Sequence, residues 1–490
     1  MRYDIKNTTL WFRHILPIGV GVGILCFLIT KSALMQITCD EAYTVIILAK
    51  ETVWNLVSYK SSYTNNHILN TLCVKLLFWL SGSDSHILAR VPNIAAFILY
   101  FYAVYRFALR YIADNWLSLM FVCVMCCNPY LLDFFALIRG YGLSISLMMA
   151  SIYCAARYIF DADFKSLPLS LGLAILSVYA QFATLHYFLG LSLLLIIKHL
   201  RGFFIEKKYT GIVVQIASLA VLTALLYAPL TAIIRDNQIA YYGNDGFWAN
   251  TLMSVLKNSV YAQGYFEPLT IEVFTCLLAA LFIMAVLYIG KQMWLETWSD
   301  TEKRYPSVFA VSLFLCVALS PILQFYLLHN QYVIDRTALF YYPLLAMLMP
   351  IIPLFFEKIK RSVYLFLCGL FIVFSVNHII RSNHLDSYRE WWYDVHTYEI
   401  LDFLKTEYDK TDKKQPLRLD THWTFNPSFQ YHKDNGKLEW LAPPPYNSLP
   451  DTVNYYNFYY TVREEVPILE KKYIIIKEYG NGQWYLMKHR

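Results

Sequence analysis

Two adjacent carboxylates, Asp40 and Glu41, come shortly after the first apolar stretch of the chain. Carboxylates at a membrane surface are costly to desolvate, so each should have a partner there. They could act as a general base or bind a divalent cation such as Mg²⁺ or Mn²⁺, with Asp40 the candidate metal ligand. The structural alternative is a helix cap, because Asp commonly stands at a helix start and residues 42–50 could follow as a helix.

A second polar group, Asn65-Asn66-His67, precedes a short apolar run. Amide and imidazole groups can donate hydrogen bonds to phosphate or sugar oxygens, and they can equally cap a helix. A third group surrounds Arg139, which lies so deep in apolar sequence that it needs a partner. Its guanidinium could bind a phosphate through two parallel hydrogen bonds, or extend to water at the membrane surface.

The remaining candidates are Asp133 and Tyr141, which flank the same arginine, and Tyr332 and Arg336, at a later helix end. Asp335 could simply neutralise its neighbour Arg336. The sequence contains no P-loop, Gly-rich dinucleotide motif, GxSxG or HExxH. ATP-driven transport and serine-type hydrolysis therefore have no support.

Mostly membrane-spanning helices must position these residues. Of the 490 residues, 57% are hydrophobic and 16% are charged, whereas soluble domains carry about 25% charged residues. Runs long enough to span a bilayer lie at 13–34, 88–109, 115–132, 139–158, 167–184, 186–201, 210–230, 270–290, 307–328, 338–354 and 362–380. Lys and Arg form short clusters between these runs and the net charge is only +6, so we predict a topology signal and no nucleic-acid partner.

The Lys and Arg clusters also orient the helices, because positive loops stay in the cytoplasm. They place the N-terminus inside and the residues after the last span outside, which requires an odd number of crossings. The short run at 67–80, which contains Lys75, is therefore predicted to lie along the outer interface, leaving about eleven spans. Residues 35–87 then form one long external loop within a membrane module of residues 1–380.

The tail, residues 381–490, is predicted to be a small external α/β domain. Residues 391–408 show the periodicity of an amphipathic helix. Residues 472–478 and 483–488 flank a Gly-Asn-Gly turn, which predicts a hairpin. The tail contains no cysteine, so no disulfide framework supports it.

Several of these motifs together resemble those of the multi-pass GT-C glycosyltransferases, in particular the bacterial relatives of dolichyl-phosphate-mannose protein mannosyltransferases and of the lipid A aminoarabinose transferase. The resemblance covers about residues 11–380. It rests on four short motifs in order, which are Asp40-Glu41-Ala42-Tyr43, then Asn65-Asn66-His67 with the sequence down to Arg90-Val91-Pro92-Asn93, then Asn128-Pro129 with Arg139-Gly140-Tyr141-Gly142, and finally Tyr332 and Arg336 with Pro343. Many relatives carry Pro-Pro or Lys-Pro-Pro near the second motif, and this chain has neither.

The resemblance implies an all-α polytopic membrane fold whose first external loop carries interfacial helices. It implies an inverting glycosyltransferase that moves a sugar from a polyprenyl-phosphate carrier to an acceptor on the external face. Asp40 would be the catalytic residue and Glu41 the second acidic residue of its motif. The residues predicted to meet the donor phosphate or sugar are Asn66, His67, Asp133, Arg139, Tyr141, Tyr332 and Arg336. This reading requires Asp40 to lie within reach of Arg139 and Arg336.

This function would place the protein in the bacterial inner membrane, with a cytoplasmic N-terminus and a periplasmic C-terminal domain. Its partners would be the lipid-linked donor, membrane lipid and an acceptor that is a protein, lipid A, a glycan or a wall polymer. One alternative is a polysaccharide ligase or polymerase that uses Arg and His in a large external loop. Others are a lipid or solute transporter, which predicts inverted repeats and broken helices, and a non-catalytic membrane scaffold.

Overall fold

The structure is a computed structural model of the whole chain. It describes residues 10–60, 65–206, 209–236, 243–261, 305–349, 360–382, 384–411, 415–445, 447 and 449–490, together with 279, 283, 286 and 287. Side chains of residues 201–206 and 305 are not among the features described.

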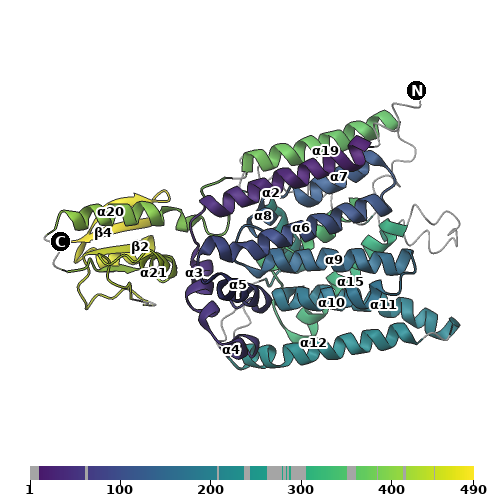
Figure 1. Cartoon of the computed structure of the whole chain (residues 1–490), viewed down its shortest axis with the longest axis horizontal. Helices are drawn as coiled ribbons and strands as arrows, with labels where there is room; N and C mark the ends of the chain where they lie inside the picture. The colour runs from purple at the N-terminus through teal and green to yellow at the C-terminus, as the bar shows by residue number, and fades with distance from the viewer. Residues whose placement is uncertain are drawn as a thin grey trace. The chain divides into compact units, whose positions relative to one another are not determined.

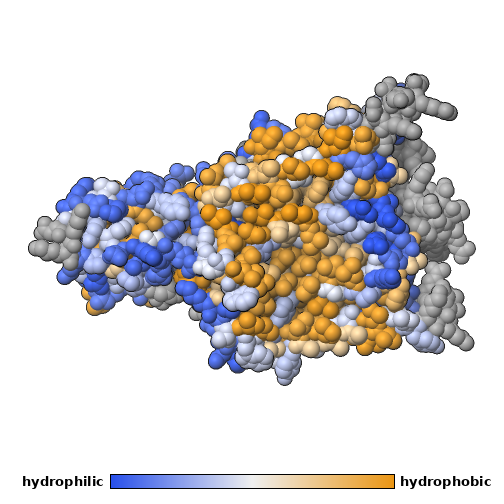
Figure 2. Space-filling view, in the orientation of Figure 1, coloured by the Kyte–Doolittle hydropathy of each residue, from blue (hydrophilic) through white to orange (hydrophobic). Residues whose placement is uncertain are grey.

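Seven helical segments within the described residues are long and apolar enough to cross a membrane. They are Trp11–Leu34 (η1, Trp11–Ile15, and α2, Leu16–Leu34), α6 (His86–Tyr111), α9 (Gly140–Phe160), Phe182–Leu200 (η3, Phe182–Thr184, and most of α11, Leu185–Glu206), α12 (Thr210–Arg235), Pro306–Leu328 (in α15, Tyr305–Leu328) and α19 (Arg361–Ser382). Three shorter apolar helices accompany them, α5 (Ile68–Ser81), α7 (Asn115–Cys126) and α10 (Ser166–Ala180). Several of the long helices run side by side (Figure 1) and present a broad apolar surface (Figure 2). The predicted polytopic helical fold is confirmed.

The predicted span at 115–132 is two helices, because the chain is recapped inside it. Helix α7 ends at Cys126 and α8 (Pro129–Asp133) begins after Asn128. The Asn128 side chain accepts a hydrogen bond from the main-chain N–H of Leu131 at 3.0 Å, and proline is well suited to the first helical position. The predicted span at 270–290 lies largely outside the described residues, and the one at 338–354 lies partly outside them, with α17 (Tyr341–Ala346) inside.

By its internal contacts the chain forms two compact units. The first contains Met1–Thr30, Trp54–Asn70 and Val91–Asn383. The second contains Lys31–Val53, Thr71–Arg90 and His384–Arg490. The C-terminal residues therefore share a unit with two stretches of the predicted first external loop.

In the first unit, small polar side chains join α9 to α10. The hydroxyl groups of Ser144 and Ser177 lie 3.0 Å apart, and each also donates to the other residue's carbonyl at 2.9 Å. Ser151 and Ser170 repeat the arrangement further along the same helices. Small side chains let two apolar helices approach closely. This pairing holds the N-terminal end of α9 against the C-terminal end of α10. Shorter elements of this unit are α4 (Val53–Val57, except Val53), η4 (Phe247–Leu252), α13 (Met253–Ser259) and α16 (Asp335–Ala338).

The second unit contains a four-stranded sheet with the order β1-β2-β4-β3. Its strands are β1 (Leu419–Thr421), β2 (Phe458–Val462), β3 (Tyr473–Tyr479) and β4 (Trp484–His489). Strands β1 and β2 are parallel, with Asp420 beside Tyr459, and β4 runs antiparallel to both β2 and β3. The predicted hairpin is confirmed, and its turn uses Gly480 and Gly482 with φ of +58° and +78°, values that glycine adopts without strain.

Helices α20 (Thr397–Asp409) and α21 (Asn426–Asn435) pack on this sheet and form its core. The predicted helix at 391–408 is confirmed from Thr397 onward, and its first residues form the 3₁₀ turn η7 (Trp392–His396). Two further short 3₁₀ and helical segments follow β2, η8 (Arg463–Glu465) and α22 (Val466–Leu469). The small C-terminal α/β domain is therefore present as predicted.

The first-loop part of the second unit consists of α3 (Cys39–Ile46), η2 (Leu48–Lys50) and most of α5. Lys75 is the one charged residue of α5. Its ammonium group donates to the carbonyl of Ala49 at 3.0 Å, which satisfies a carbonyl at the end of η2. Helix α5 has 14 residues, fewer than the roughly twenty that a span requires.

Candidate functional site

Helix α3 begins with the predicted acidic pair in its first turn. The sequence Thr38-Cys39-Asp40-Glu41 has the spacing of a capping box, in which the residue three positions into the helix binds back to the cap residue. The Glu41 carboxylate accepts a hydrogen bond from the main-chain N–H of Thr38 at 2.9 Å. The helix-cap alternative is therefore correct for Glu41, whose side chain closes the N-terminus of α3.

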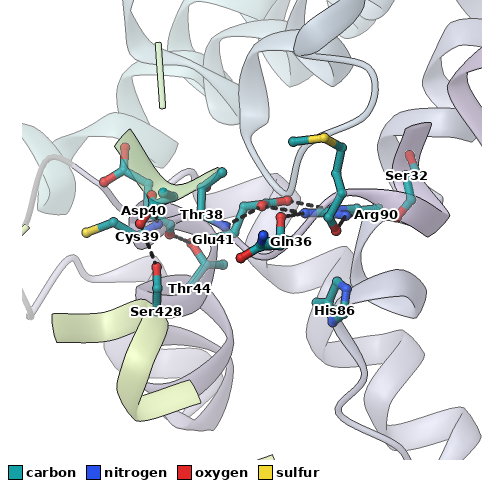
Figure 3. A network of polar contacts seen from close by, with 12 residues as sticks. Ser32, Gln36, Thr38, Cys39, Asp40, Glu41, Thr44, His86, Arg90 and Ser428 are labelled. Atoms are coloured by element: carbon teal, nitrogen blue, oxygen red, sulfur yellow. Dashed lines mark hydrogen bonds and ion pairs between the residues drawn. The ribbon is translucent and has the colours of Figure 1, made fainter. Parts of the chain in front are cut away.

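Glu41 is also half of a fully buried ion pair (Figure 3). The guanidinium of Arg90 donates to the two carboxylate oxygens of Glu41 at 2.8 and 2.7 Å, and neither side chain is exposed. Arg90 donates further to the carbonyls of Ser32 and Met35 at 2.8 Å and of Gln36 at 2.7 Å. Buried charges are tolerated when their hydrogen-bonding groups are matched in this way. Glu41 and Arg90 thus fix the path of residues 32–41 within the second unit.

Arg90 was not among the predicted site residues, although it lies in the second family-like motif. Its signal in the sequence is an arginine inside the apolar run 88–109. A buried arginine needs a carboxylate, and Glu41 was an available one. What the sequence could not show is that residues 49 positions apart would meet.

Asp40 differs from Glu41 in environment. Its side chain is half-buried, and in Figure 3 it leaves the helix away from the Glu41–Arg90 pair. Successive residues of an α-helix point about 100° apart, so the two carboxylates cannot both face Arg90. Its main-chain carbonyl accepts a hydrogen bond from the Thr44 hydroxyl at 3.0 Å, which is a further contact within the first turns of α3.

The acidic pair was considered as a possible binding site for a divalent cation. Among the described residues, no group of three or more His, Cys, Asp or Glu side chains is arranged to hold a metal ion. With Glu41 bound to Arg90, this motif offers a divalent cation the single carboxylate of Asp40, whereas Mg²⁺ and Ca²⁺ sites gather several oxygen ligands.

In the first unit, the structure brings together four of the predicted donor-site residues. The imidazole of His67 lies 4.9 Å from the ring of Tyr141, and the guanidinium carbon of Arg139 lies 5.8 Å from the same ring. Arg139 donates a short hydrogen bond to the side-chain oxygen of Asn65. Arg336 comes from α16 and is near enough for its positive charge to act on His67. Arg139 therefore shares the Tyr141 ring with His67, and the positive charge of Arg336 also acts on the histidine.

His67 is held as a neutral side chain. Burial lowers its pKa well below the usual value, and the positive charges of Arg139 and Arg336 lower the pKa further. Hydrogen bonds with the Ala180 carbonyl and the Gln181 side chain oppose this shift. Its Nδ1 lies 3.1 Å from the Ala180 carbonyl. A carbonyl oxygen can only accept, so Nδ1 carries the proton and Nε2 is left as an acceptor.

Gly140, the first residue of α9, permits this arrangement. A Cβ atom there would lie 2.1 Å from the Ala180 carbonyl oxygen and 2.8 Å from Cβ of His67. Both distances are too short for any side chain. The glycine of the third family-like motif therefore has a steric reason, because it lets α9 begin directly against the histidine and its carbonyl partner.

The other predicted donor-site residues have different neighbours. Asp133 is buried, and one carboxylate oxygen accepts a hydrogen bond from the Tyr261 hydroxyl at 2.7 Å. Tyr332 is buried against Phe325, with ring centroids 4.6 Å apart. These contacts favour structural roles for Asp133 and Tyr332.

Asn66 and Asp335 also make contacts within the first unit. The amide nitrogen of Asn66 donates to the Leu56 carbonyl at 3.2 Å, and its side-chain oxygen is buried without a hydrogen-bond partner among the described residues. Asp335, which could have neutralised Arg336, accepts a hydrogen bond from the side chain of Asn258 at 2.9 Å.

No protein-family model matches this sequence, and no curated protein is significantly similar to it. The chain is similar to two crystal structures of ArnT from Cupriavidus metallidurans, one bound to undecaprenyl phosphate and one in the apo state. The TM-scores are 0.47 and 0.46 at 12% and 11% sequence identity, with 96% of this chain and 97% of the other covered in each case. The roles proposed for individual residues therefore rest on the contacts described above.

Proposed function

We propose that this protein is an inverting glycosyltransferase that moves a sugar from a polyprenyl-phosphate carrier to an acceptor hydroxyl on the external face of the membrane. The observation that carries the proposal is the buried, neutral His67, which lies with Arg139 against the Tyr141 ring and is also subject to the positive charge of Arg336. Positively charged guanidinium groups that act on a buried neutral imidazole suit a ligand that combines negative charge with a hydroxyl group. A sugar phosphate has both.

The two arginines suit the leaving group. In the proposed reaction an acceptor oxygen attacks the anomeric carbon while the bond from that carbon to the phosphate oxygen breaks. Negative charge grows on the departing polyprenyl phosphate, and guanidinium groups fixed in a low-dielectric site stabilise such charge strongly. A single direct displacement inverts the configuration at the anomeric carbon.

Asp40 suits the other half of the reaction. We assign it as the general base that takes the proton of the acceptor hydroxyl, a task for which a positioned carboxylate is appropriate. Its neighbour Glu41 is bound to Arg90 and is assigned as a positioning residue for the first turn of α3. The motif thus supplies one reactive and one structural carboxylate.

The membrane topology predicted from the sequence supports an external location for α3 and the C-terminal domain. The Lys and Arg clusters between the apolar runs predict cytoplasmic loops, which places α3 and the C-terminal domain outside. An amphipathic lipid-linked sugar would be met at this boundary between lipid and water. We propose the bacterial inner membrane as the location, as the resemblance to bacterial membrane glycosyltransferases implies.

The test separates binding from transfer. Purified protein in lipid nanodiscs is titrated with undecaprenyl phosphate, and transfer is followed by mass analysis of glycans and lipids from cells that express each variant. Asp40→Asn should bind undecaprenyl phosphate within about twofold of wild type but lose transfer by about 10²–10⁴-fold, the usual contribution of a general base. Arg139→Gln and Arg336→Gln should weaken binding by roughly tenfold to hundredfold, because a hydrogen bond to a charged group contributes about 1.5–3 kcal/mol.

Arg110→Gln is the matched control. Arg110 is half-exposed and pairs with Asp161 at 2.8 Å, on a loop predicted to be cytoplasmic, so both readouts should remain at wild-type values. Full transfer by Asp40→Asn would exclude the assigned base. Unchanged binding by both arginine variants would exclude the assigned phosphate site and favour a ligase, a transporter or a scaffold.

A further inference from the structure

The N-terminus of α3 is bound by a residue from the C-terminal domain. Asp394, in η7, accepts a hydrogen bond from the main-chain N–H of Cys39 at 2.8 Å. Its other carboxylate oxygen accepts from the hydroxyl of Ser428 at 3.0 Å. Asp394 is 3% exposed. The first N–H groups of a helix have no partner within it, so Asp394 supplies what Cys39 lacks, at the residue directly before Asp40.

The side chain of Gln36 connects the same two segments in the reverse sense. The amide nitrogen of Gln36 donates to the carbonyl of Val395 at 2.9 Å, and its amide oxygen accepts from the main-chain N–H of Tyr398 at 3.0 Å. Tyr398 stands in the first turn of α20, where main-chain N–H groups also lack partners within the helix. Residues 36–39 and 394–398 therefore cap one another's helices.

The turn that carries Asp394 is itself held by the sheet. Trp392 packs on Trp484 of β4 with ring centroids 4.3 Å apart. His396 packs on Tyr479 of β3 with ring centroids 4.6 Å apart. The position of Asp394 is thus set by the folded hairpin and not by a freely moving loop.

We propose that Asp394 is a positioning residue for Asp40, through which the C-terminal domain sets the geometry of the catalytic carboxylate. This inference deepens the proposed function and depends on Asp40 being the base. Asp394 binds the main chain one residue before Asp40, so its loss lets the first turn of α3 move. Shifts of about 1 Å in a reacting group cost on the order of a hundredfold in rate. Its buried carboxylate holds Cys39 and Ser428 and does not itself contact substrate.

Two substitutions of Asp394 distinguish a positioning role from direct participation in the reaction. Asparagine at position 394 keeps an acceptor for Cys39 and gains a donor for the Ser428 hydroxyl. It therefore preserves both contacts, although it can neither take up a proton nor carry charge. Alanine loses both contacts. If Asp394 is a positioning residue, Asp394→Asn should retain sugar transfer and Asp394→Ala should lose it. If Asp394 acts directly as an acid or base, both variants should lose transfer.

The experiment uses the full-length protein in nanodiscs and two independent readouts. The first is hydrogen–deuterium exchange of the peptide covering residues 38–46, and the second is transfer in cells with undecaprenyl phosphate binding as a companion measurement. Asp394→Ala should accelerate exchange of this peptide and reduce transfer by about tenfold or more each, the effect of leaving a buried main-chain N–H without its hydrogen-bond partner, with binding within about twofold of wild type. Asp394→Asn should stay within about threefold of wild type on every readout.

Asp402→Ala is the matched control, because Asp402 is an exposed aspartate on α20 and its loss should change neither readout. If Asp394→Ala does not fold, Gln36→Ala should show the same pattern in milder form. Unchanged exchange in Asp394→Ala, or an inactive Asp394→Asn that exchanges like wild type, would overturn the inference. If Asp40→Asn transfers sugar at the wild-type rate, the proposed function fails. The hydrogen–deuterium exchange of the Asp394 variants then still tests whether Asp394 holds the first turn of α3.

Discussion

Gly140 stands where α9 begins, directly against His67 and the carbonyl of Ala180, and adding one methyl group there perturbs the proposed phosphate site without removing any of its residues. In Gly140→Ala the new Cβ would lie 2.1 Å from the Ala180 oxygen and 2.8 Å from His67 Cβ, against an ordinary contact of at least 3.4 Å. The nearest obstacle is main chain, which cannot rotate away. The start of α9 must therefore move by about 1 Å, and such overpacking costs about 1–3 kcal/mol.

The displacement should act on binding through His67. Moving α9 away from Ala180 disturbs the 3.1 Å contact that fixes the imidazole tautomer, and it moves Arg139, which directly precedes Gly140. If most of the 1–3 kcal/mol is expressed when ligand is bound, undecaprenyl phosphate affinity falls by about fivefold to a hundredfold. Titration of nanodisc-embedded protein measures the affinity, and thermal denaturation measures any loss of stability.

Gly172→Ala provides the matched comparison. Gly172 lies inside α10, and a Cβ there would have no atom within 4 Å. Exchanging glycine for alanine inside a helix is generally favourable by about 0.5–1 kcal/mol, so this variant should bind normally and denature at the same or a higher temperature. Wild-type affinity together with wild-type stability in Gly140→Ala would refute the close packing on which the proposed site depends.

Three further predictions concern the second unit and the topology. Arg90→Met leaves the Glu41 carboxylate buried without its cation and should lower the stability of the folded protein by about 3–5 kcal/mol, seen as a lower denaturation temperature, whereas the double variant with Glu41→Gln should recover part of the loss. Burial raises the pKa of Asp394 well above its usual range, and the nearby charges of Asp40 and Glu41 add to this despite two opposing hydrogen bonds. As the pH falls, the folded protein therefore binds this proton at a higher pH than the unfolded chain does. The free energy of unfolding should rise as the pH falls from the raised pKa toward about 4, the pKa of an Asp in the unfolded chain. In denaturation scans at different pH values, Asp394→Asn should abolish this rise. Alkaline phosphatase fused after Arg490 should be active and a fusion at Asp161 inactive, since the enzyme works only outside the cytoplasm; the opposite pattern would invert the proposed orientation.

Much of the architecture could be predicted because it depends on signals local in sequence. Long apolar runs predict spanning helices, and the Gly-Asn-Gly turn between two β-rich segments predicts the hairpin from Tyr473 to His489. The split of the run at 115–132 was predictable in principle, because Asn128-Pro129 is a recognisable helix start. Apolar composition outweighed that short signal in the prediction.

The site was predictable to a smaller extent, because its contacts join distant segments. The family resemblance predicts His67, Arg139, Tyr141 and Arg336 among the donor-binding residues, and in the structure these four interact with one another. The identity of their partners could not be read from the sequence. The carbonyl that fixes the tautomer of His67 belongs to Ala180, an apolar residue with no chemical signal in its side chain.

The division of labour between Asp40 and Glu41 follows from helix geometry once α3 is known to be a helix. Two consecutive side chains diverge by about 100°, so an acidic pair in a first turn cannot present both carboxylates to one ligand. The longer Glu41 side chain reaches back to the Thr38 N–H and across to Arg90. Arg90 in turn holds the carbonyls of residues 32, 35 and 36, so the buried pair determines how the chain enters α3. Under the proposed function, this adjacent pair of acids is thus better understood as one reactive group and its support than as two equivalent catalysts, and the support continues through Cys39 to Asp394.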